Sequence, residues 1–213
     1  MGFSDYSINL GGALICGYTG VGPDAIVNRS AVKSSVRGSE VAMDVLTAAQ
    51  PKKLYILLGT NTLTTLGAAD RFLAYYGQML DQLRQALPGC VIYVQSIPPV
   101  RPQAAAEKPG LASDVLRSVN EQLAKLAADK GCVYLDLWET FADENGESEG
   151  DAGGSGWGPL LGRKRLWSLG HLPAQPCKVF GQQFLDDGQC VQRSVTLILG
   201  GNLEFYAEHL KKC

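Results

Sequence analysis

Histidine is scarce in this sequence, with only His171 and His209 among 213 residues. The six cysteines include no Cys-x-x-Cys pair, so the ligand pattern of a common zinc site is missing. Long apolar runs are missing too, and none approaches the roughly 20 residues of a membrane span. A net charge of −2 provides no basic surface for nucleic acid or an anionic membrane. These absences predict a chain with no metal site, no nucleic-acid partner and no membrane span.

The first residues also lack the features of a secretion signal. Residues 1–6 contain no basic segment followed by an apolar stretch. Cys16, Cys90 and Cys132 lie in or beside apolar runs, where a free cysteine is typically a small core residue, and this suits a reducing compartment. We therefore expect a cytoplasmic protein as the sequence stands, whereas a parent protein with a longer N-terminus could be secreted. The length suits one domain with a proper core. Nothing in the sequence indicates an oligomeric state.

Residues 11–141 alternate between apolar runs and helical patterns. Short continuous apolar runs, typical of strands covered on both faces, occur at 13–16, 53–58, 91–94 and 132–137. Apolar residues recur at spacings of three and four over 69–87 and 111–126, and a shorter helix is predicted over 40–49. This alternation predicts an α/β fold with a doubly wound parallel sheet and right-handed crossovers.

The character of the chain changes after Gly146. Residues 147–156 are acidic and rich in glycine, and a basic patch follows at 163–165. No helix or strand period continues convincingly beyond them, apart from the apolar run at 195–199. The sequence thus divides into a regular part, residues 1–146, and an irregular tail, residues 147–213.

Two glycine-containing segments follow predicted strands. Gly59-Thr60-Asn61-Thr62 comes at the end of the strand at 53–58, where open α/β sheets place their ligands. A side-chain N–H of Asn61 at that position can point at a developing oxyanion, although an Asn after a Gly on its own is ordinary turn chemistry. Residues 17–22 follow the preceding strand and would expose backbone N–H groups beside Asn61.

In order and spacing, these blocks resemble the SGNH/GDSL hydrolase family over residues 10–146. The resemblance implies a three-layer, flavodoxin-like sheet with helices on both faces and ester hydrolysis by a Ser-His-Asp mechanism, without a cofactor. It also implies that Gly20 and Asn61 donate hydrogen bonds to the oxyanion. Thr62 stands where the family's Gly-x-Asn-Asp motif has its Asp. Substrates implied by the resemblance are small esters, including acylated carbohydrates.

Two other blocks of the family are missing as the sequence stands. It contains neither the Gly-Asp-Ser of the nucleophile nor the Asp-x-x-His near the C-terminus. Ser4 is offered as a substitute nucleophile, but only three residues precede it, so no strand would present it as a strained elbow. We therefore expect Met1 to be an internal start just past the serine, and the first strand of the fold to be lacking.

The tail has a specific interpretation. The DNA that encodes residues 156 onward, read one nucleotide later, permits Asp-Gly-Val-His and then the pattern of a closing amphipathic helix. We therefore interpret residues 147–213 as a frameshifted remnant of the same domain as residues 1–146. Under this reading His171 is no general base but an accident of translation. A lone histidine at such a position is in any case more often a surface or core residue.

The sequence leaves three functions open. The first is an ester hydrolase whose chain as written has little or no activity, because nucleophile, acid and base are absent. The second is a non-catalytic binding module that keeps a pocket for acyl groups or carbohydrates. The third is a nucleotide binder, suggested by the glycines at 17, 20 and 22, which do not form the Gly-x-Gly-x-x-Gly pattern. The lacking first strand would sit centrally, so we also expect unpaired strand edges and poor folding.

Overall fold

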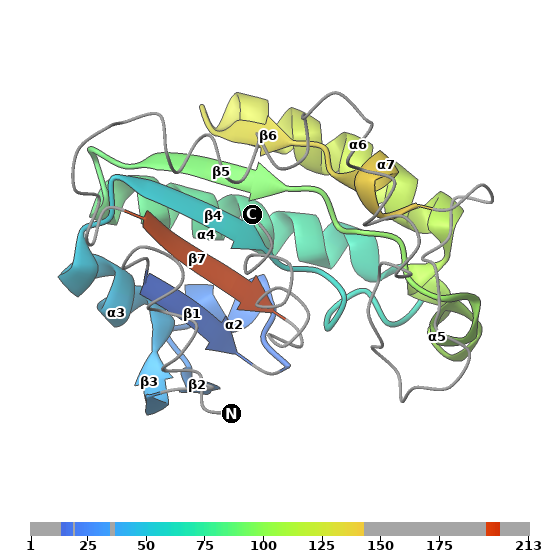
Figure 1. Cartoon of the computed structure of the whole chain (residues 1–213), viewed down its shortest axis with the longest axis horizontal. Coiled ribbons are helices and arrows are strands. Elements are labelled where there is room, and N and C mark those ends of the chain that lie inside the picture. The colour runs from blue at the N-terminus through green and yellow to red at the C-terminus, as the bar shows by residue number, and fades with distance from the viewer. Residues whose placement is uncertain (1–13, 19, 35–36, 143–194, 201–213) are drawn as a thin grey trace, which may run out of the picture.

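The computed structural model describes residues 14–18, 20–34, 37–142 and 195–200, which form a sheet with helices packed against it (Figure 1). The strands are β1 (Leu14–Tyr18), β2 (Ala31–Ser34), β3 (Gly38–Val41), β4 (Lys53–Leu57), β5 (Val91–Gln95), β6 (Val133–Leu135) and β7 (Val195–Gly200). The helices are α2 (Pro23–Val27), α3 (Ala42–Ala49), α4 (Ala68–Ala86), α5 (Pro102–Glu107), α6 (Ser113–Asp129) and α7 (Trp138–Phe141), with a 3-10 turn η1 (Pro109–Leu111). The predicted α/β class is confirmed.

The described strands form one sheet in the order β3-β2-β1-β7-β4-β5-β6. β1, β7, β4, β5 and β6 run parallel, and β2 and β3 add an antiparallel hairpin beside β1. Parallel neighbours have their carboxyl ends at one edge, so the loops that follow β1 and β4 emerge on the same side of the sheet. The predicted parallel sheet is confirmed, whereas the hairpin at one edge was not predicted.

The centre of the sheet is occupied by β7, from the far end of the chain (Figure 1). In the observed register Cys16 and Ile56 both lie opposite Ile198. The expectation that strand edges would be left unpaired in the middle of the sheet is therefore wrong, because β7 pairs with β1 on one side and with β4 on the other. The apolar run at 195–199, which the sequence analysis left within the irregular tail, forms this strand.

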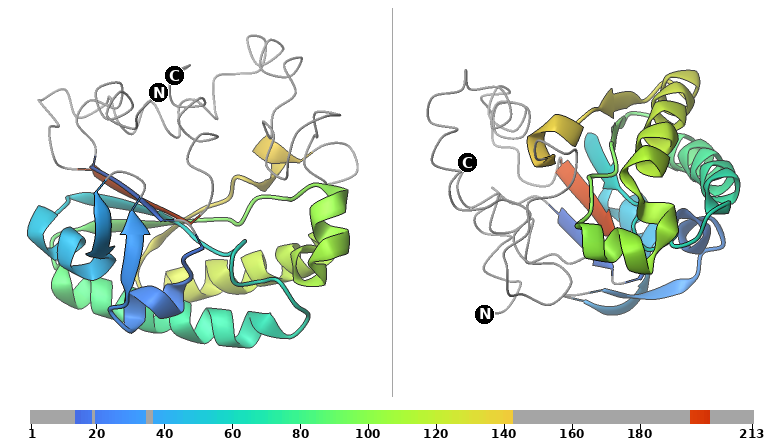
Figure 2. Two further views of the ribbon diagram at one scale, coloured as in Figure 1. Left: turned by 90° about the horizontal axis from the view of Figure 1, so that it is seen from below. Right: turned by 90° about the vertical axis from the view of Figure 1, so that its right-hand side faces the viewer.

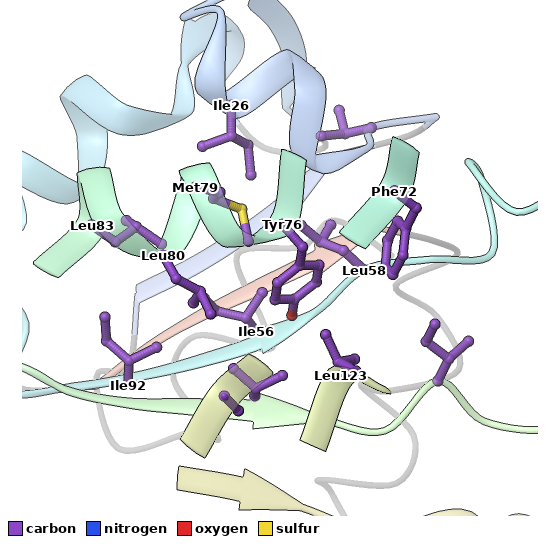
Figure 3. Close-up of a cluster of buried hydrophobic side chains, with 14 of the residues drawn as sticks. Ile26, Ile56, Leu58, Phe72, Tyr76, Met79, Leu80, Leu83, Ile92 and Leu123 are labelled. Atoms are coloured by element: carbon purple, nitrogen blue, oxygen red, sulfur yellow. The ribbon is translucent and has the colours of Figure 1, made fainter. Parts of the chain in front are cut away.

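The long helices α4 and α6 cover one face of the sheet, together with α2 (Figures 1 and 2). Their apolar residues recur every three or four positions and meet the alternate residues of β4 and β5 that point to that face. Figure 3 shows the resulting core, whose fully buried members include Ile56, Tyr76, Leu80 and Leu123. No helix in the described part of the chain is both long and apolar enough to cross a membrane.

The opposite face of the central strands carries a pair of tyrosines. Tyr55 and Tyr93 are register partners on β4 and β5 and stack with ring centroids 4.5 Å apart and planes 8° apart. Both rings are buried. Most of the tail, residues 147–194 and 201–213, lies outside the described residues.

Candidate active site at the carboxyl edge of the sheet

The chain turns back immediately after β4. The backbone N–H groups of Thr62 and Leu63 both donate to the carbonyl oxygen of Gly59, each at 2.9 Å. Gly59 has φ 153°, and an added Cβ would lie 2.5 Å from Cδ1 of Ile97. Only glycine therefore fits the start of this turn. The turn holds Asn61 at the end of the strand, half exposed to solvent.

A second glycine loop follows β1 and touches the first. Gly20 is exposed and has φ 74°, which favours glycine. Gly22 is in contact with the β4 loop, because a Cβ added to it would lie 2.3 Å from Oγ1 of Thr62. Nδ2 of Asn61 donates to the carbonyl oxygen of Val21 at 3.5 Å, a long and therefore weak hydrogen bond. An amide nitrogen has two N–H groups, so this contact leaves donor capacity in Asn61.

A pocket of about 510 Å³ opens between the two loops. Gly20 and Gly22 line it from the β1 side, and Asn61 and Thr62 line it from the β4 side. The structure thus brings the two predicted site residues, Gly20 and Asn61, to one cavity at the carboxyl edge of the parallel sheet. Their role as oxyanion donors stays a prediction. Ser4 and His171, also named from the sequence, lie outside the described residues.

Helices α2 and α4 supply the charged part of the pocket wall. Asp24 comes from α2, and Arg71 and Tyr75 come from the first two turns of α4. The guanidinium carbon of Arg71 lies 5.6 Å from the centroid of the Tyr75 ring, within range of a cation–π contact that orients the side chain. Leu66 adds an apolar lining residue, and its exposed fraction of 68% leaves it open to a ligand. The described lining therefore combines one cation, one carboxylate, hydroxyls and an apolar rim.

None of these helix residues was found from the sequence. A usable signal existed, since a helix that follows a strand of an open α/β sheet begins near the carboxyl edge where ligands bind. Polar residues in the first turns of the helix after Asn61 were thus candidates by position. Only the apolar positions of that helix were interpreted from the sequence. Among the described residues, no group of three or more histidine, cysteine, aspartate or glutamate residues is arranged to hold a metal ion.

A polar network lies on the other side of β1, against the edge hairpin. The guanidinium group of Arg37 donates to both carboxylate oxygens of Glu40, at 2.9 and 2.7 Å. The hydroxyl of Tyr18 donates to Glu40 at 2.8 Å, and Arg37 also reaches Sγ of Cys16 at 3.5 Å. None of these residues lines the pocket. The network therefore fixes the β2–β3 hairpin to β1 rather than contributing to the site.

Burial and hydrogen bonding shift the pKa values of this network. Burial raises the pKa of Cys16 despite the nearby cation of Arg37, so the thiol stays protonated at neutral pH. Burial alone would raise the pKa of Glu40, but the hydrogen bonds from Arg37 and Tyr18 outweigh it and the pKa is lowered. Cys16, Cys90 and Cys132 are all free thiols, and Cys16 is the only one of these three that is fully buried. Burial raises the pKa of Cys90 to about 11.

Comparisons with known proteins add to this geometry. The sequence profile of the GDSL-like Lipase/Acylhydrolase family matches residues 12–172. A solved structure from Streptococcus pneumonia, described as a candidate platelet activating factor, is similar with 13% sequence identity and a TM-score of 0.50, covering 83% of this chain and 91% of that chain. At this identity the likeness concerns the fold alone. No curated protein matches the sequence significantly. The family match spans both loops of the pocket.

Proposed function

Because the chain belongs to the GDSL-like lipase/acylhydrolase family, we propose that its pocket binds the carbonyl group of an ester between Gly20 and Asn61. Ester hydrolysis is the chemistry of the family. The observation that supports the assignment is that both residues line one cavity at the carboxyl edge of a parallel sheet. The backbone N–H of Gly20 and the side-chain amide of Asn61 then donate to the oxygen that becomes negative when the carbonyl carbon is attacked.

The full reaction requires three further groups. A serine hydroxyl attacks the carbonyl carbon, a histidine takes the hydroxyl proton and returns it to the leaving alcohol, and an aspartate orients the histidine. The sequence contains no Gly-Asp-Ser and no Asp-x-x-His, and the described pocket lining includes no histidine. We therefore propose that this chain stabilises the oxyanion but turns over slowly. Sites without a triad retain at most about 10³–10⁴-fold catalysis over water.

Binding of a transition-state mimic tests the oxyanion assignment without requiring turnover. The monoanion of phenyl methylphosphonate carries tetrahedral, negatively charged oxygens like those of the intermediate. We expect it to bind the full chain and to bind Asn61→Ala about 10- to 100-fold more weakly, the loss of one hydrogen bond to a charged group. Asn28→Ala is the matched control, because Asn28 is exposed at the end of α2 and does not line the pocket. Equal affinity in all three proteins would refute the assignment.

Hydrolysis of a short-chain aryl ester tests the second half of the proposal. We expect slow hydrolysis, accelerated over the rate in buffer by no more than about 10³–10⁴-fold. Faster, saturable turnover that Asn61→Ala abolishes would show a complete active site, and would contradict slow turnover while keeping the oxyanion role. The phosphonate assay thus tests the oxyanion role and the ester assay tests turnover, so either prediction can be wrong without the other.

A non-catalytic binding module is the second candidate, favoured by the pocket wall. Asp24, Arg71 and Tyr75 provide a carboxylate, a guanidinium and an aromatic ring beside the proposed carbonyl site, a combination that suits an acylated carbohydrate. An acetylated sugar should then raise the melting temperature of the chain without release of acetate. Release of acetate under the same conditions would exclude this candidate.

A further inference from the structure

The two loops of the pocket belong to strands that do not pair with each other. Gly20 follows β1, at the end of the group β3-β2-β1, and Asn61 follows β4, at the end of the group β4-β5-β6. In the described sheet β7 alone lies between them, with Gly200 opposite Tyr18 and Leu199 opposite Leu57. The site is therefore divided between two groups of strands that the C-terminal strand joins.

The width of one strand sets the separation of these two groups. Neighbouring strands lie 4.7–4.9 Å apart, so β1 and β4 are held roughly 9.5 Å apart by β7. The other contacts between the two groups are made by loops, helices and side chains, such as that of Gly22 with Thr62, and include no strand pairing. Helix α2 packs against α4 (Figure 2), and the hydrogen bond from Asn61 to Val21 is long, at 3.5 Å. Without β7, both β1 and β4 would present an open edge of unpaired N–H and C=O groups.

We propose that docking of residues 195–200 between β1 and β4 of the same chain is the step that assembles the pocket. None of these residues lines the cavity, so the strand acts as a positioning element for Gly20 and Asn61. The groove between β1 and β4 is thus a strand-binding site whose partner is the C-terminal segment of the chain itself. This role of residues 195–200 does not depend on whether the pocket binds or hydrolyses an ester.

Hydrogen exchange of the full-length chain provides the first test. Amides of residues 195–200 should exchange more than about 100-fold more slowly than in the unfolded chain, in line with those of β4. Exchange at the rate of the unfolded chain would overturn the proposal. This measurement requires no substitution and therefore no assumption about how a variant folds.

A cross-link to a native cysteine tests register and chain identity. Cys16 lies opposite Ile198 on the neighbouring strand, and adjacent strands meet the Cα separation that a disulfide requires. Under mild oxidation at alkaline pH, where the buried Cys16 thiol can ionise, Ile198→Cys should form a Cys16 cross-link within one chain, identified by mass spectrometry. Leu197→Cys, one register position away, is the matched control and should not. Three results would overturn the proposal. They are equal cross-linking of both variants, cross-linking between chains, and no cross-link at all in a protein whose residues 195–200 are protected from hydrogen exchange.

A proline in β7 tests the effect on the pocket. Leu197→Pro removes a backbone donor from a central strand, where proline is not accommodated. We expect at least tenfold faster exchange at residues 20–22 and 59–63, with little change in α6, and weaker binding of phenyl methylphosphonate. Val133→Pro, at the first residue of the edge strand β6, is the control and should leave both loops unchanged. Pocket loops that keep their exchange rates in Leu197→Pro would overturn the positioning role, whether or not the phosphonate binds.

Discussion

Replacement of Gly22 by alanine should press the two pocket loops apart. Gly22 has φ −113° and ψ 173°, an extended conformation that alanine adopts without strain. Its missing side chain is nevertheless essential to the packing. An added Cβ would lie 2.3 Å from Oγ1 of Thr62 and 2.6 Å from Oδ1 of Asp24, distances that real Cβ atoms do not tolerate. The substitution therefore tests the contact between the β1 loop and the β4 loop directly.

The size of the effect follows from what must move. Rotation of Thr62 and Asp24 away from their positions costs about 0.5–1.5 kcal/mol for each side chain. Loss of backbone freedom in the unfolded chain returns about 0.4–1 kcal/mol in favour of alanine. The ranges combine to a loss of about 0–2.6 kcal/mol, and we expect Gly22→Ala to lower the free energy of unfolding by about 1.3 kcal/mol, the middle of that range.

A double-mutant cycle separates this contact from other effects. In the Thr62→Ala background the nearest remaining atom of residue 62 is Cβ, 3.6 Å from the added group, which is ordinary contact. Gly22→Ala should then be about 1 kcal/mol less destabilising, as measured by urea unfolding at constant m-value. Gly20→Ala is the control in the same loop. Alanine at position 20 is strained because φ is 74°, but its Cβ would have no atom within 4 Å. The loss of unfolding free energy in Gly20→Ala should therefore add to that in Thr62→Ala.

Two results would refute this account of the loop contact. If Gly22→Ala is as destabilising with alanine at position 62 as with threonine, the two loops do not touch at this point. If Gly20→Ala couples to Thr62→Ala as strongly as Gly22→Ala does, the coupling reflects the loop as a whole rather than one contact.

Two further predictions concern parts of the structure away from the pocket. Asn120→Ala removes two buried hydrogen bonds to the backbone of Ile97, at 2.8 and 2.9 Å, and should lower the free energy of unfolding by about 2–4 kcal/mol in urea; a loss below 0.5 kcal/mol would contradict the pairing. Glu40 has a lowered pKa because hydrogen bonds from Arg37 and a tyrosine outweigh burial, so its stabilising contribution is present above pH 4.5 and is lost as the pH falls through the folded-state pKa. Glu40→Gln should therefore flatten the acid side of the stability curve measured from pH 7 to 3, and parallel curves would argue against the linkage.

The elements with a repeating apolar pattern could be predicted from the sequence. The helix expected over 69–87 is α4, Ala68–Ala86, because its larger apolar residues recur on one face that is mostly buried, with Phe72, Tyr76, Met79, Leu80 and Leu83 in the core. Several elements without such a pattern were not predicted, among them α5 and the strands β2 and β3. Helix α5 has no buried residues, and the β2–β3 hairpin is mostly exposed and held by the side chains of Arg37 and Glu40. Elements that bury little apolar surface leave no periodic signal in the sequence.

The position of β7 was beyond the reach of the sequence for a different reason. A short apolar run such as 195–199 indicates a strand but carries no information about its neighbours, because any parallel strand with two covered faces has the same composition. Its pairing with β1 joins residues about 180 positions apart, and such non-local contacts have no local signature. Gly20 and Asn61 were accessible because each follows its own strand closely. Arg71 was not, since its position in the pocket depends on how α4 packs.

Thr62 is the residue at which this site departs from the Gly-x-Asn-Asp motif, and its surroundings give that departure a physical basis. Oγ1 of Thr62 and Oδ1 of Asp24 both approach the space beside Gly22, within 2.3 and 2.6 Å of the same point. The two oxygens are therefore no more than about 5 Å apart, and a carboxylate at position 62 would place a second negative charge close to that of Asp24. A neutral hydroxyl avoids the resulting repulsion. The carboxylate of Asp24 and the hydroxyl of Thr62 are therefore compatible as a pair, and the only described cation on the pocket wall, Arg71, stays available for a ligand.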